Sequence, residues 1–303
     1  MIEAKNLTKI YRRKKKELKA IDKLSFNVRK GEIFGIIGPT GAGKTTTVKI
    51  LSTLILPDEG NAYINGYDVV KDADRVKKII GVVAGEFTRA LYWRLTGRGN
   101  LEFFAKMRGL RNINERIDYL LELFNLKDYE NELLMRYSTG MKHKLALAVA
   151  LLHDPPILFL DEPLTGIDPL TAYEIKELIR REFKDKTIIW TSHNLYEIEE
   201  MCHRILLLNK GKKIVEGKVN ELKKKYWEYK KIIVDCENPE KLAGIAEKIE
   251  GNMVEIKTKN VEEIIKKLAE MMENEDIKIN SIKTVEPSLE DIFMAVVKND
   301  KRN

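Results

Sequence analysis

The sequence predicts an α/β protein with a parallel-sheet core, antiparallel strands ahead of it and a small α+β domain behind it. Three observations support this fold class. The apolar run 33–37, "IFGII", leads through a glycine-rich turn into the helix-like stretch "TTVKILSTLI". Two further buried-strand runs, 157–161 and 187–193, flank a stretch with helical periodicity. Strands that alternate with helices are typical of parallel sheets.

The glycine-rich turn, "GPTGAGKTTT", matches the pattern G-x-x-x-x-G-K-[ST] at Gly38, Gly43, Lys44 and Thr45. Backbone N–H groups in such a turn can surround phosphate oxygens, and the helix that follows adds its positive dipole end. Lys44 can reach the terminal phosphates, and the Thr45 hydroxyl can ligate Mg²⁺. The strand before the turn and the helix after it favour this interpretation over a chance glycine-rich turn.

Outside this core, the elements follow from periodicity. Alternating polar and apolar residues in 1–35 and the strand-turn-strand pattern in 57–69 predict an antiparallel sheet. Residues from about 97 to 150 have apolar positions at helical spacing. The stretch 204–217 predicts a closing hairpin, and from residue 230 the order strand, helix, strand, helix, strand, helix predicts a ferredoxin-like domain.

Composition limits the class of protein. The 303 residues, 44% hydrophobic and 33% charged, are typical of one or two globular domains. The chain has no apolar run near the roughly 20 residues that span a bilayer, and its first 20 residues lack the apolar core of a secretory signal. We therefore expect a cytoplasmic protein. Cys202 and Cys236 lack metal-ligand spacing and are predicted to be inert thiols.

The net charge of +7 raises the possibility of a nucleic-acid or anionic-membrane partner. Lysines and glutamates alternate through much of the chain, as on solvated helix faces, and only the block 12–16, "RRKKK", is concentrated. The sequence therefore predicts no nucleic-acid partner.

A second motif, which carries two carboxylates, completes the nucleotide site. The apolar run "ILFLD" ends in Asp161, which can point a carboxylate at Mg²⁺ beside Thr45. Glu162 follows directly and can polarise a water for attack on the γ-phosphate. Taken alone, the pair could be a surface turn at a strand end. Beside a phosphate loop it predicts a hydrolytic centre.

In this order, the motifs resemble those of the ATP-binding subunits of ABC transporters, over residues 1 to about 225. The stretch 137–169, "YSTGMKHKLALAVALLHDPPILFLDEPLTGIDP", is similar to the family's signature sequence leading into Walker B and the D-loop. The stretch 187–217, "TIIWTSHNLYEIEEMCHRILLLNKGKKIVEG", is similar to its switch-histidine segment and closing hairpin. The resemblance implies a P-loop NTPase of the ABC ATPase fold, with an N-terminal antiparallel β subdomain and a helical signature subdomain.

The resemblance also implies domains and cofactors. It gives an ABC ATP-binding domain at 1–225, with its helical subdomain at about 97–150, and a C-terminal α+β accessory domain at 226–303. It implies ATP and Mg²⁺ as cofactors. The residues implied to hold the phosphates and the metal are Gly38, Pro39, Thr40, Gly41, Ala42, Gly43, Lys44, Thr45 and Thr46, with Asp161 supporting Mg²⁺.

Further roles come from the resemblance position by position. Tyr11 matches the aromatic residue that stacks on adenine, and His193 matches the histidine that senses the γ-phosphate. Glu162 matches the general base, and Asp168 matches the D-loop aspartate at the subunit contact. A lone histidine at a strand end is more often structural, but its place in the family order favours a catalytic role here.

Ser138 and Gly140 match the signature "LSGGQ", which in this family contacts the γ-phosphate held by the other subunit. Ser138 is predicted to cap the helix that begins near Met141, leaving N–H groups for an anion. Taken alone, an ordinary N-cap without a ligand explains Ser138 equally well. With the resemblance, a head-to-tail dimer follows, either a homodimer or a heterodimer with a second ATP-binding cassette.

The sequence departs from the family pattern in two places. Its signature reads "YSTGM", so Thr139 and Met141 replace a glycine and a polar residue. The segment that should carry a glutamine touching Mg²⁺ and the attacking water has Glu86 as its nearest match. A carboxylate at this place can ligate Mg²⁺ but adds negative charge near the γ-phosphate. We therefore predict an active ATPase with altered coupling, with Glu86 as a catalytic and metal-binding candidate.

The function implied is an ATPase that energises transport through a separate integral membrane permease, from the inner face of the cell membrane. The C-terminal stretch "VEPSLEDIFMAVV" resembles the extension on export-type cassettes for drugs, sodium, lipids or polysaccharides. Tyr92 and Trp93, beside Arg89 and Arg94, are either core aromatics or the groove for a permease helix. The alternatives are a non-catalytic or regulatory cassette and a soluble ABC ATPase not linked to transport.

Overall fold

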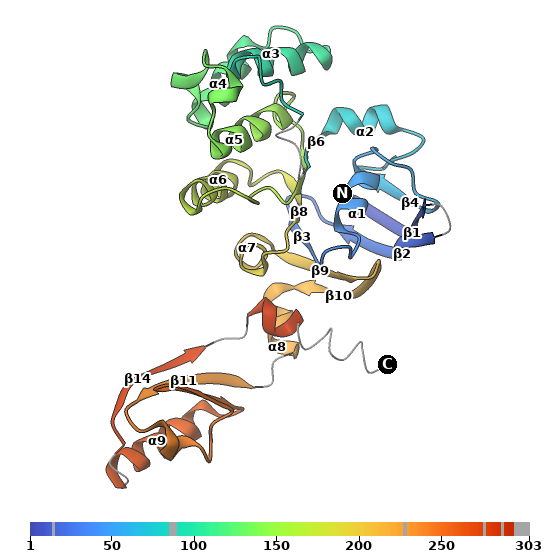
Figure 1. Cartoon of the computed structure of the whole chain (residues 1–303). Helices are drawn as coiled ribbons and strands as arrows, with labels where there is room; N and C mark the ends of the chain where they lie inside the picture. Colours follow the sequence, from blue (N-terminus) through green and yellow to red (C-terminus); the bar gives the residue numbers. More distant parts are fainter. Residues whose placement is uncertain (14–15, 85–89, 227–228, 275–276, 286–287, 294–303) are drawn as a thin grey trace. The chain divides into compact units, whose positions relative to one another are not determined.

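The computed structural model describes residues 1–13, 16–84, 90–226, 229–274, 277–285 and 288–293 (Figure 1). The chain divides into two compact units, Met1–Gly217 and Lys218–Asn303. The division falls at the start of α8 (Val219–Tyr226), a little before the predicted boundary at 225. In the described ranges, no helix combines the length and apolar character that crossing a bilayer requires.

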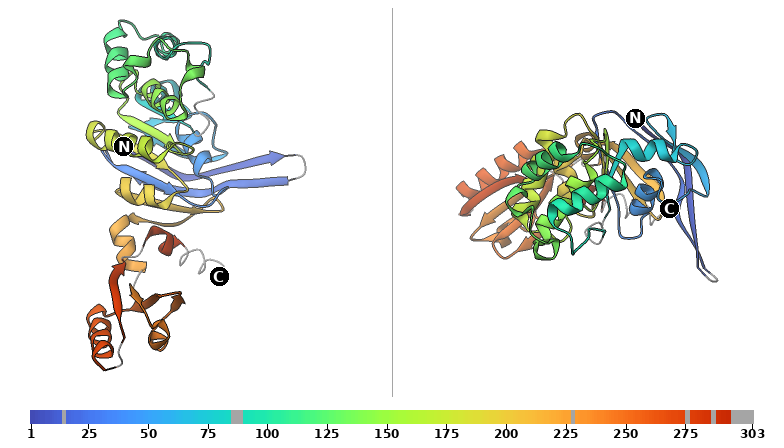
Figure 2. Two further views of the ribbon diagram at one scale, coloured as in Figure 1. Left: turned by 60° about the vertical axis from the view of Figure 1, so that its left-hand side comes forward. Right: turned by 90° about the horizontal axis from the view of Figure 1, so that it is seen from above.

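The first unit begins with an antiparallel sheet of order β2-β1-β4-β5, as predicted. The two leading strands are long, because pairing continues from Ile2 opposite Val28 to Tyr11 opposite Leu18 and beyond. Figure 2 shows this hairpin extending away from the rest of the unit. The strands of this sheet are β1 (Ile2–Arg13), β2 (Lys16–Val28), β4 (Glu59–Ile64) and β5 (Tyr67–Asp68).

The central sheet has the order β10-β9-β3-β8-β7-β6, and the pairs from β9 to β6 are parallel. β7 and β8 are buried along their whole length, which explains their continuous apolar sequences. Because the strands are parallel, the ends of β3, β7 and β8 lie at one edge, where the motifs follow. The strands are β3 (Ile33–Ile37), β6 (Ile80–Val83), β7 (Ile157–Asp161), β8 (Thr187–Thr191), β9 (Arg204–Asn209) and β10 (Lys212–Lys218).

One hydrophobic core joins the two sheets. It includes Leu7 and Leu24 of the antiparallel sheet, Phe34 of β3, and Ile50 of the helix after the glycine-rich turn, all no more than 1% exposed. Burying such side chains contributes about 1.5–3 kcal/mol each. The helix and the strand that carry the phosphate-binding motif are therefore held by both sheets.

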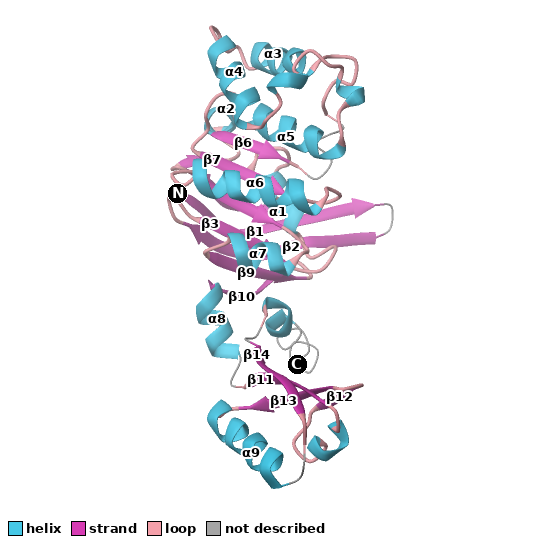
Figure 3. Cartoon of the chain, turned by 90° about the vertical axis from the view of Figure 1, so that its left-hand side faces the viewer, coloured by secondary structure: helices cyan, strands magenta, loops and turns pink. Residues whose placement is uncertain are grey.

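Several helices of this unit begin at a residue whose side chain caps them. Thr96, Ser138 and Asp168 each accept a hydrogen bond from a backbone N–H of the first turn that follows. Figure 3 shows α3, α4 and α5 gathered at one end of the unit, as predicted for residues 97–150. The helices are α1 (Lys44–Leu51), α2 (Ala73–Ile79), α3 (Gly97–Met107), α4 (Asn114–Leu123), α5 (Thr139–Ala150), α6 (Pro169–Glu182) and α7 (Leu195–Met201).

The second unit is an antiparallel sheet of order β12-β13-β11-β14 with its own core. Its first two strands along the chain, β11 and β12, are separated in the sheet by β13. This is the split arrangement of ferredoxin-like folds. Leu268 of the helix α9 packs in the core with Ile232 and Val254 of the sheet. The elements are β11 (Lys230–Cys236), β12 (Lys248–Glu250), β13 (Met253–Thr258), α9 (Val261–Asn274) and β14 (Ile279–Val285).

One predicted helix of this unit is wrong. The stretch 239–249, "PEKLAGIAEKI", forms only the 3-10 turn Pro239–Leu242 before the chain enters β12. Gly244 disfavours continuation of the helix, and Ile249 instead pairs with Val254 across the turn at Gly251, which has a φ of 58°. The last predicted helix is present over 289–293, and the residues after 293 lie outside the described ranges.

Candidate functional site

The glycine-rich turn, 38–43, connects β3 to α1. Gly43 has a φ of 107°, and a Cβ there would lie 2.5 Å from the Ala20 carbonyl oxygen, so the turn requires glycine. Gly43 also occupies the N-cap position of α1, where it has no side chain to bond the first helical amides. The amino end of α1 therefore presents N–H groups and a positive dipole end to an anion.

Lys44 is buried, with 7% of its surface exposed, at the first position of α1. Its Nζ donates hydrogen bonds to the carbonyl oxygens of Gly38 at 2.7 Å and Pro39 at 3.4 Å. Burial lowers the pKa of Lys44, while the carboxylates of Glu162 and Asp161 act in the opposite direction. The ammonium group is thus folded back onto its own loop, beside two acidic groups.

Asp161 and Thr191 end the neighbouring parallel strands β7 and β8 and lie opposite each other in register. The Thr191 hydroxyl donates to Asp161 Oδ1, and the Thr45 hydroxyl of α1 donates to the same oxygen at 3.3 Å. The carboxylate and the Thr45 hydroxyl are hard oxygen donors of the kind that Mg²⁺ prefers. The described residues contain no group of three or more acidic, histidine or cysteine side chains that could hold a metal.

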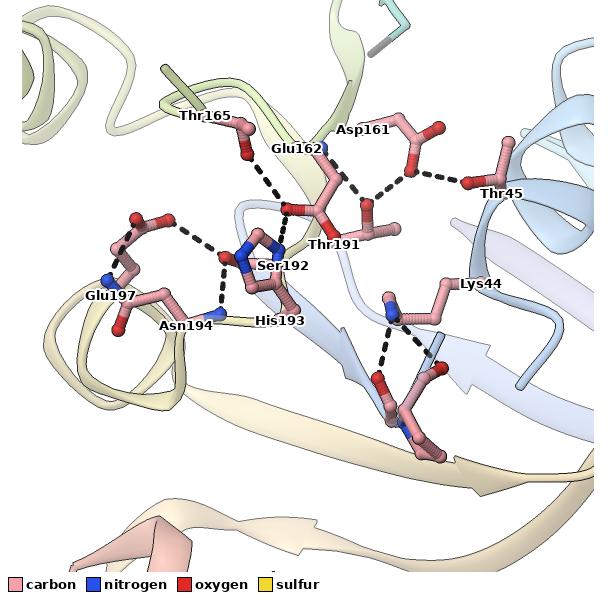
Figure 4. A network of polar contacts seen from close by, with 12 residues as sticks. Lys44, Thr45, Asp161, Glu162, Thr165, Thr191, Ser192, His193, Asn194 and Glu197 are labelled. Atoms are coloured by element: carbon pink, nitrogen blue, oxygen red, sulfur yellow. Dashed lines mark hydrogen bonds and ion pairs between the residues drawn. The ribbon is translucent and has the colours of Figure 1, made fainter. Parts of the chain in front are cut away.

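Glu162 has a left-handed backbone with a φ of 54°, which is uncommon for a residue with a side chain. Its N–H donates to the Thr191 carbonyl oxygen at 3.0 Å, and this bond holds the unusual conformation. Its carboxylate oxygen Oε2 accepts a hydrogen bond from the Thr165 hydroxyl at 3.1 Å and lies 2.7 Å from His193 Nδ1 (Figure 4). The strained backbone thus aims a carboxylate at a histidine in the turn that follows the neighbouring strand β8.

The structure brings Lys44, Thr45, Asp161, Glu162 and His193 together at the carboxyl edge of the sheet (Figure 4). Asp161 ends β7, Glu162 and His193 follow β7 and β8, and Lys44 and Thr45 begin α1, which follows β3. Open α/β sheets bind ligands at this edge.

The signature residues lie on another part of the unit. The Ser138 hydroxyl accepts a hydrogen bond from Met141 N–H at 3.1 Å and caps α5, as predicted. A Cβ on Gly140 would lie 2.8 Å from the side chain of Thr171, so the start of α5 packs closely against α6. Asp168 caps α6 through Thr171 N–H at 2.9 Å, and that bond lowers the pKa of the Asp168 carboxyl. The signature and D-loop residues are therefore neighbours.

Tyr11 is a predicted site residue that is not part of this cluster. Tyr11 lies on β1, opposite Leu18, with 39% of its surface exposed and Lys9 Nζ 6.0 Å from its ring centroid. Its ring can therefore be reached by a ligand. Glu86 lies outside the described residues and stays a prediction.

Several residues of the site were not predicted from the sequence: Thr165, Thr191, Ser192, Asn194 and Glu197, all shown in Figure 4. Thr191 could have been found, because it ends a buried strand in the same way as Asp161. The role of Thr165 depends on a turn whose shape the sequence does not reveal. His143 was not predicted either, and its Nδ1 lies 3.0 Å from the Pro163 carbonyl oxygen, linking the signature helix to the residue after Glu162.

The glycine requirement gives a testable expectation. Replacing Gly43 by Ala is expected to lower the free energy of unfolding by about 2–4 kcal/mol, because strain adds to the contact with the Ala20 backbone. Gly41→Ala is the matched control, since Gly41 has a φ of 81° but no atom within 4 Å of the place that a Cβ would take. It is expected to cost only about 1–2 kcal/mol. Urea unfolding measures both, and equal losses would contradict the role of the contact.

Comparisons with known proteins agree with this geometry. Residues 21–165 match the family described as ABC transporter, and residues 217–297 match the C-terminal domain of the ATP-binding proteins described as DrrA1-3-like. The chain is 35% identical over 308 residues to YhcH of Bacillus subtilis (strain 168), an uncharacterized ABC transporter ATP-binding protein; the alignment covers 99% of this chain and 97% of that protein. It is 40% identical over 208 residues to the daunorubicin resistance ATP-binding protein DrrA3 of Streptomyces coeruleorubidus, covering 68% of this chain and 65% of DrrA3.

Among solved structures, the chain resembles the ATP-binding cassette MJ0796, in a dimeric post-hydrolysis state bound to ADP and Pi. The TM-score is 0.65 and the sequence identity 30%, over 72% of this chain and 99% of that one. This similarity confirms the predicted ABC ATPase fold. With a relative matched over nearly its whole length and with the phosphate loop, carboxylates and histidine meeting at one sheet edge, the chain belongs to the ATP-binding proteins of ABC transporters, a family of cassettes that bind and hydrolyse ATP.

Proposed function

We propose that this chain hydrolyses MgATP to energise export through a separate membrane permease, acting as one of two cassettes that close head to tail. The observation that carries the proposal is the contact of 2.7 Å between Glu162 and His193, set beside Asp161 and Thr45. A carboxylate and a histidine placed together at the phosphate-binding edge support a proton-transfer reaction at the end of a bound triphosphate.

The nucleotide-binding part of the mechanism uses groups that bond to one another in this structure. The Lys44 ammonium leaves the carbonyl oxygen of Gly38 to contact the terminal phosphates, together with the N–H groups of the turn. Thr45 and Asp161 would hold Mg²⁺, which supplies positive charge to the phosphate oxygens when it is bound. Tyr11 offers an exposed ring on which the adenine can stack.

The hydrolytic step falls to Glu162, which accepts the proton of the attacking water. Oε2 is already engaged by Thr165 and His193, so Oε1 is the oxygen available to the water. His193 uses Nδ1 toward Glu162, which leaves Nε2 for a phosphate oxygen.

Dimerisation is supported by the signature segment and by the dimer of MJ0796. Ser138 and Gly140 stand at the amino end of α5, a twelve-residue helix whose dipole favours an anion. Asp168, beside them at Thr171, would lie at the contact between the cassettes. We propose that each ATP is held by Lys44 of one cassette and by Ser138 of the other, in a homodimer or a heterodimer. Glu86 remains the proposed counterpart of the family glutamine.

A permease partner and a place on the inner face of the membrane are supported by an exposed aromatic surface. Trp93 is 55% exposed and Tyr92 is 47% exposed, so neither is a core residue. Lys142 of the signature helix places Nζ 5.3 Å from the Trp93 ring centroid, which connects this surface to the dimer contact. The direction of transport, export, is supported by the similarity to the resistance protein DrrA3 and by the DrrA1-3-like match of the C-terminal domain.

Purification tests the transport role. The tagged full chain, extracted with detergent from its native membranes, is expected to bring down a multi-span membrane protein. Trp93→Ala is expected to weaken this association at least about tenfold, as for an aromatic hot spot. Tyr196→Ala is the control, since Tyr196 is a 68% exposed aromatic on α7. Recovery with ribosomes or DNA, and with no membrane protein, would instead support a soluble ATPase not linked to transport.

A further inference from the structure

The turn that carries His193 is anchored at both ends to one side chain, Glu197 of α7. The Ser192 hydroxyl donates to Glu197 Oε2 at 3.0 Å, and Asn194 Nδ2 donates to Oε1 at 3.2 Å. The turn is also closed internally, because Asn194 N–H donates to the Ser192 hydroxyl at 3.0 Å (Figure 4). His193 is the residue between these two contacts.

Glu197 is itself held in place by its helix. It lies in the first turn of α7, where the positive end of the helix dipole favours a carboxylate. Asn194 caps this helix by accepting a hydrogen bond from Tyr196 N–H at 3.0 Å. Ile198, fully buried, and Met201, 5% exposed, fix the inner face of α7. The anchor for the turn is therefore part of a packed element.

His193 needs such an anchor because its own side chain is exposed, with 62% of its surface accessible. Packing thus does not select the rotamer of the imidazole. The ring direction depends on the backbone of the turn and on the contact with Glu162 Oε2. A catalytic group that shifts by 1 Å can lose about 100-fold in rate, so the turn geometry matters for the reaction.

We propose that Glu197 is a positioning residue for hydrolysis, which fixes the turn of residues 192–194 so that His193 Nδ1 stays at Glu162 and Nε2 faces the phosphate. This inference rests on the proposed function. Burial raises the pKa of the Glu197 carboxyl, and the nearby Glu162 carboxylate acts in the same direction, while the bonds from Ser192 and Asn194 oppose both. Burial thus makes ionisation of the Glu197 carboxyl unfavourable. The hydrogen bonds donated by Ser192 and Asn194 offset this unfavourable free energy.

The experiment uses three variants of the full chain. Glu197→Ala removes both acceptors, and Glu197→Asp keeps the charge but is one methylene too short to reach both donors. Glu197→Gln can still bond both, by donating to the Ser192 hydroxyl and accepting from Asn194. Glu200→Ala is the control, because Glu200 anchors α7 to α6 through Arg180 at 2.7 Å and through Lys176.

Two measurements distinguish a role of Glu197 in positioning His193 from a role in the general stability of α7. The first is ATP turnover, as kcat and KM. The second is the ring ¹⁵N spectrum of the four histidines, in which His193→Gln identifies the His193 signals. We expect Glu197→Ala and Glu197→Asp to lower kcat by about 10- to 100-fold with KM nearly unchanged, and to shift only the His193 signals away from the form protonated at Nδ1. Glu197→Gln is expected to stay within about threefold of wild type.

Unchanged His193 signals in Glu197→Ala and Glu197→Asp would overturn the proposal, as would an equal fall in kcat for Glu200→Ala. If Glu197→Ala does not fold, Glu197→Asp decides the matter by the same two measurements. Wild-type turnover that does not depend on Glu162 would instead count against the proposed function. The histidine spectrum, recorded without nucleotide, reports on the turn in either case.

Discussion

Glu162→Gln is expected to lower ATP turnover by about 1,000-fold while leaving the affinity for ATP within about threefold of wild type. Glutamine has nearly the same shape but cannot take a proton from water. The backbone conformation at a φ of 54° and the bond to the Thr191 carbonyl do not depend on the carboxylate, so the turn should be retained. Because hydrolysis is blocked and binding is not, the variant should accumulate as a dimer in MgATP.

Steady-state hydrolysis and size-exclusion chromatography with light scattering measure these two effects. The control is Glu182→Gln, which removes a carboxylate that pairs with Arg181 on the exposed surface of α6. It is expected to behave as wild type. Hydrolysis that is undetectable in the wild type, with a partner cassette and permease present, would support the non-catalytic alternative. A Glu162→Gln protein that remains monomeric at saturating MgATP, with a partner cassette available, would contradict the head-to-tail arrangement.

Lys44→Met is expected to weaken ATP binding by about 10- to 100-fold, the effect of losing a charge-assisted hydrogen bond to a phosphate. The stability of the nucleotide-free protein should change much less, within about 1 kcal/mol. Methionine fills the space of the lysine stem and removes a charge whose burial is unfavourable. This gain opposes the loss of the hydrogen bond to the Gly38 carbonyl oxygen.

Thermal unfolding with and without MgATP distinguishes the two effects. Wild type should be stabilised by the nucleotide in proportion to the logarithm of its concentration, and Lys44→Met should lose most of that shift. Lys49→Met serves as the control, because Lys49 is exposed on the same helix. A Lys44→Met protein that binds MgATP as wild type does would remove Lys44 from the phosphate site.

The core of the fold is predictable because its strands are short, apolar and followed by motifs. β3, β7 and β8 each stand out as four or five buried residues, and their parallel pairing follows from the intervening helices. The site residues that follow these strands then lie close together, because parallel strands end at the same edge of the sheet. The residue patterns alone are therefore enough to group Lys44, Asp161 and Glu162, and the family resemblance adds His193 to them.

The contacts that support these residues could not be predicted in the same way. Thr191 can be recognised as the end of a buried strand, but its contact with Asp161 also depends on the register between β7 and β8, which the sequence does not specify. Thr165 reaches Glu162, and Glu197 reaches the turn of His193, through local backbone shapes that no periodicity encodes. The wrong prediction of a helix at β12 has a similar explanation. Leu242, Ile245 and Ile249 have helical spacing, but pairing with β13 outweighs this local preference.

In this structure the groups proposed to act on the nucleotide bond to one another: Lys44 with Gly38, Thr45 with Asp161, and His193 with Glu162. Under the proposed function, an entering nucleotide would exchange some of these contacts and keep others. A diphosphate would take Lys44 and Thr45 from their present partners, whereas a γ-phosphate would also bond Nε2 of His193, whose Nδ1 would stay with Glu162. ADP and ATP would therefore be distinguished within one cassette, before it meets a second one.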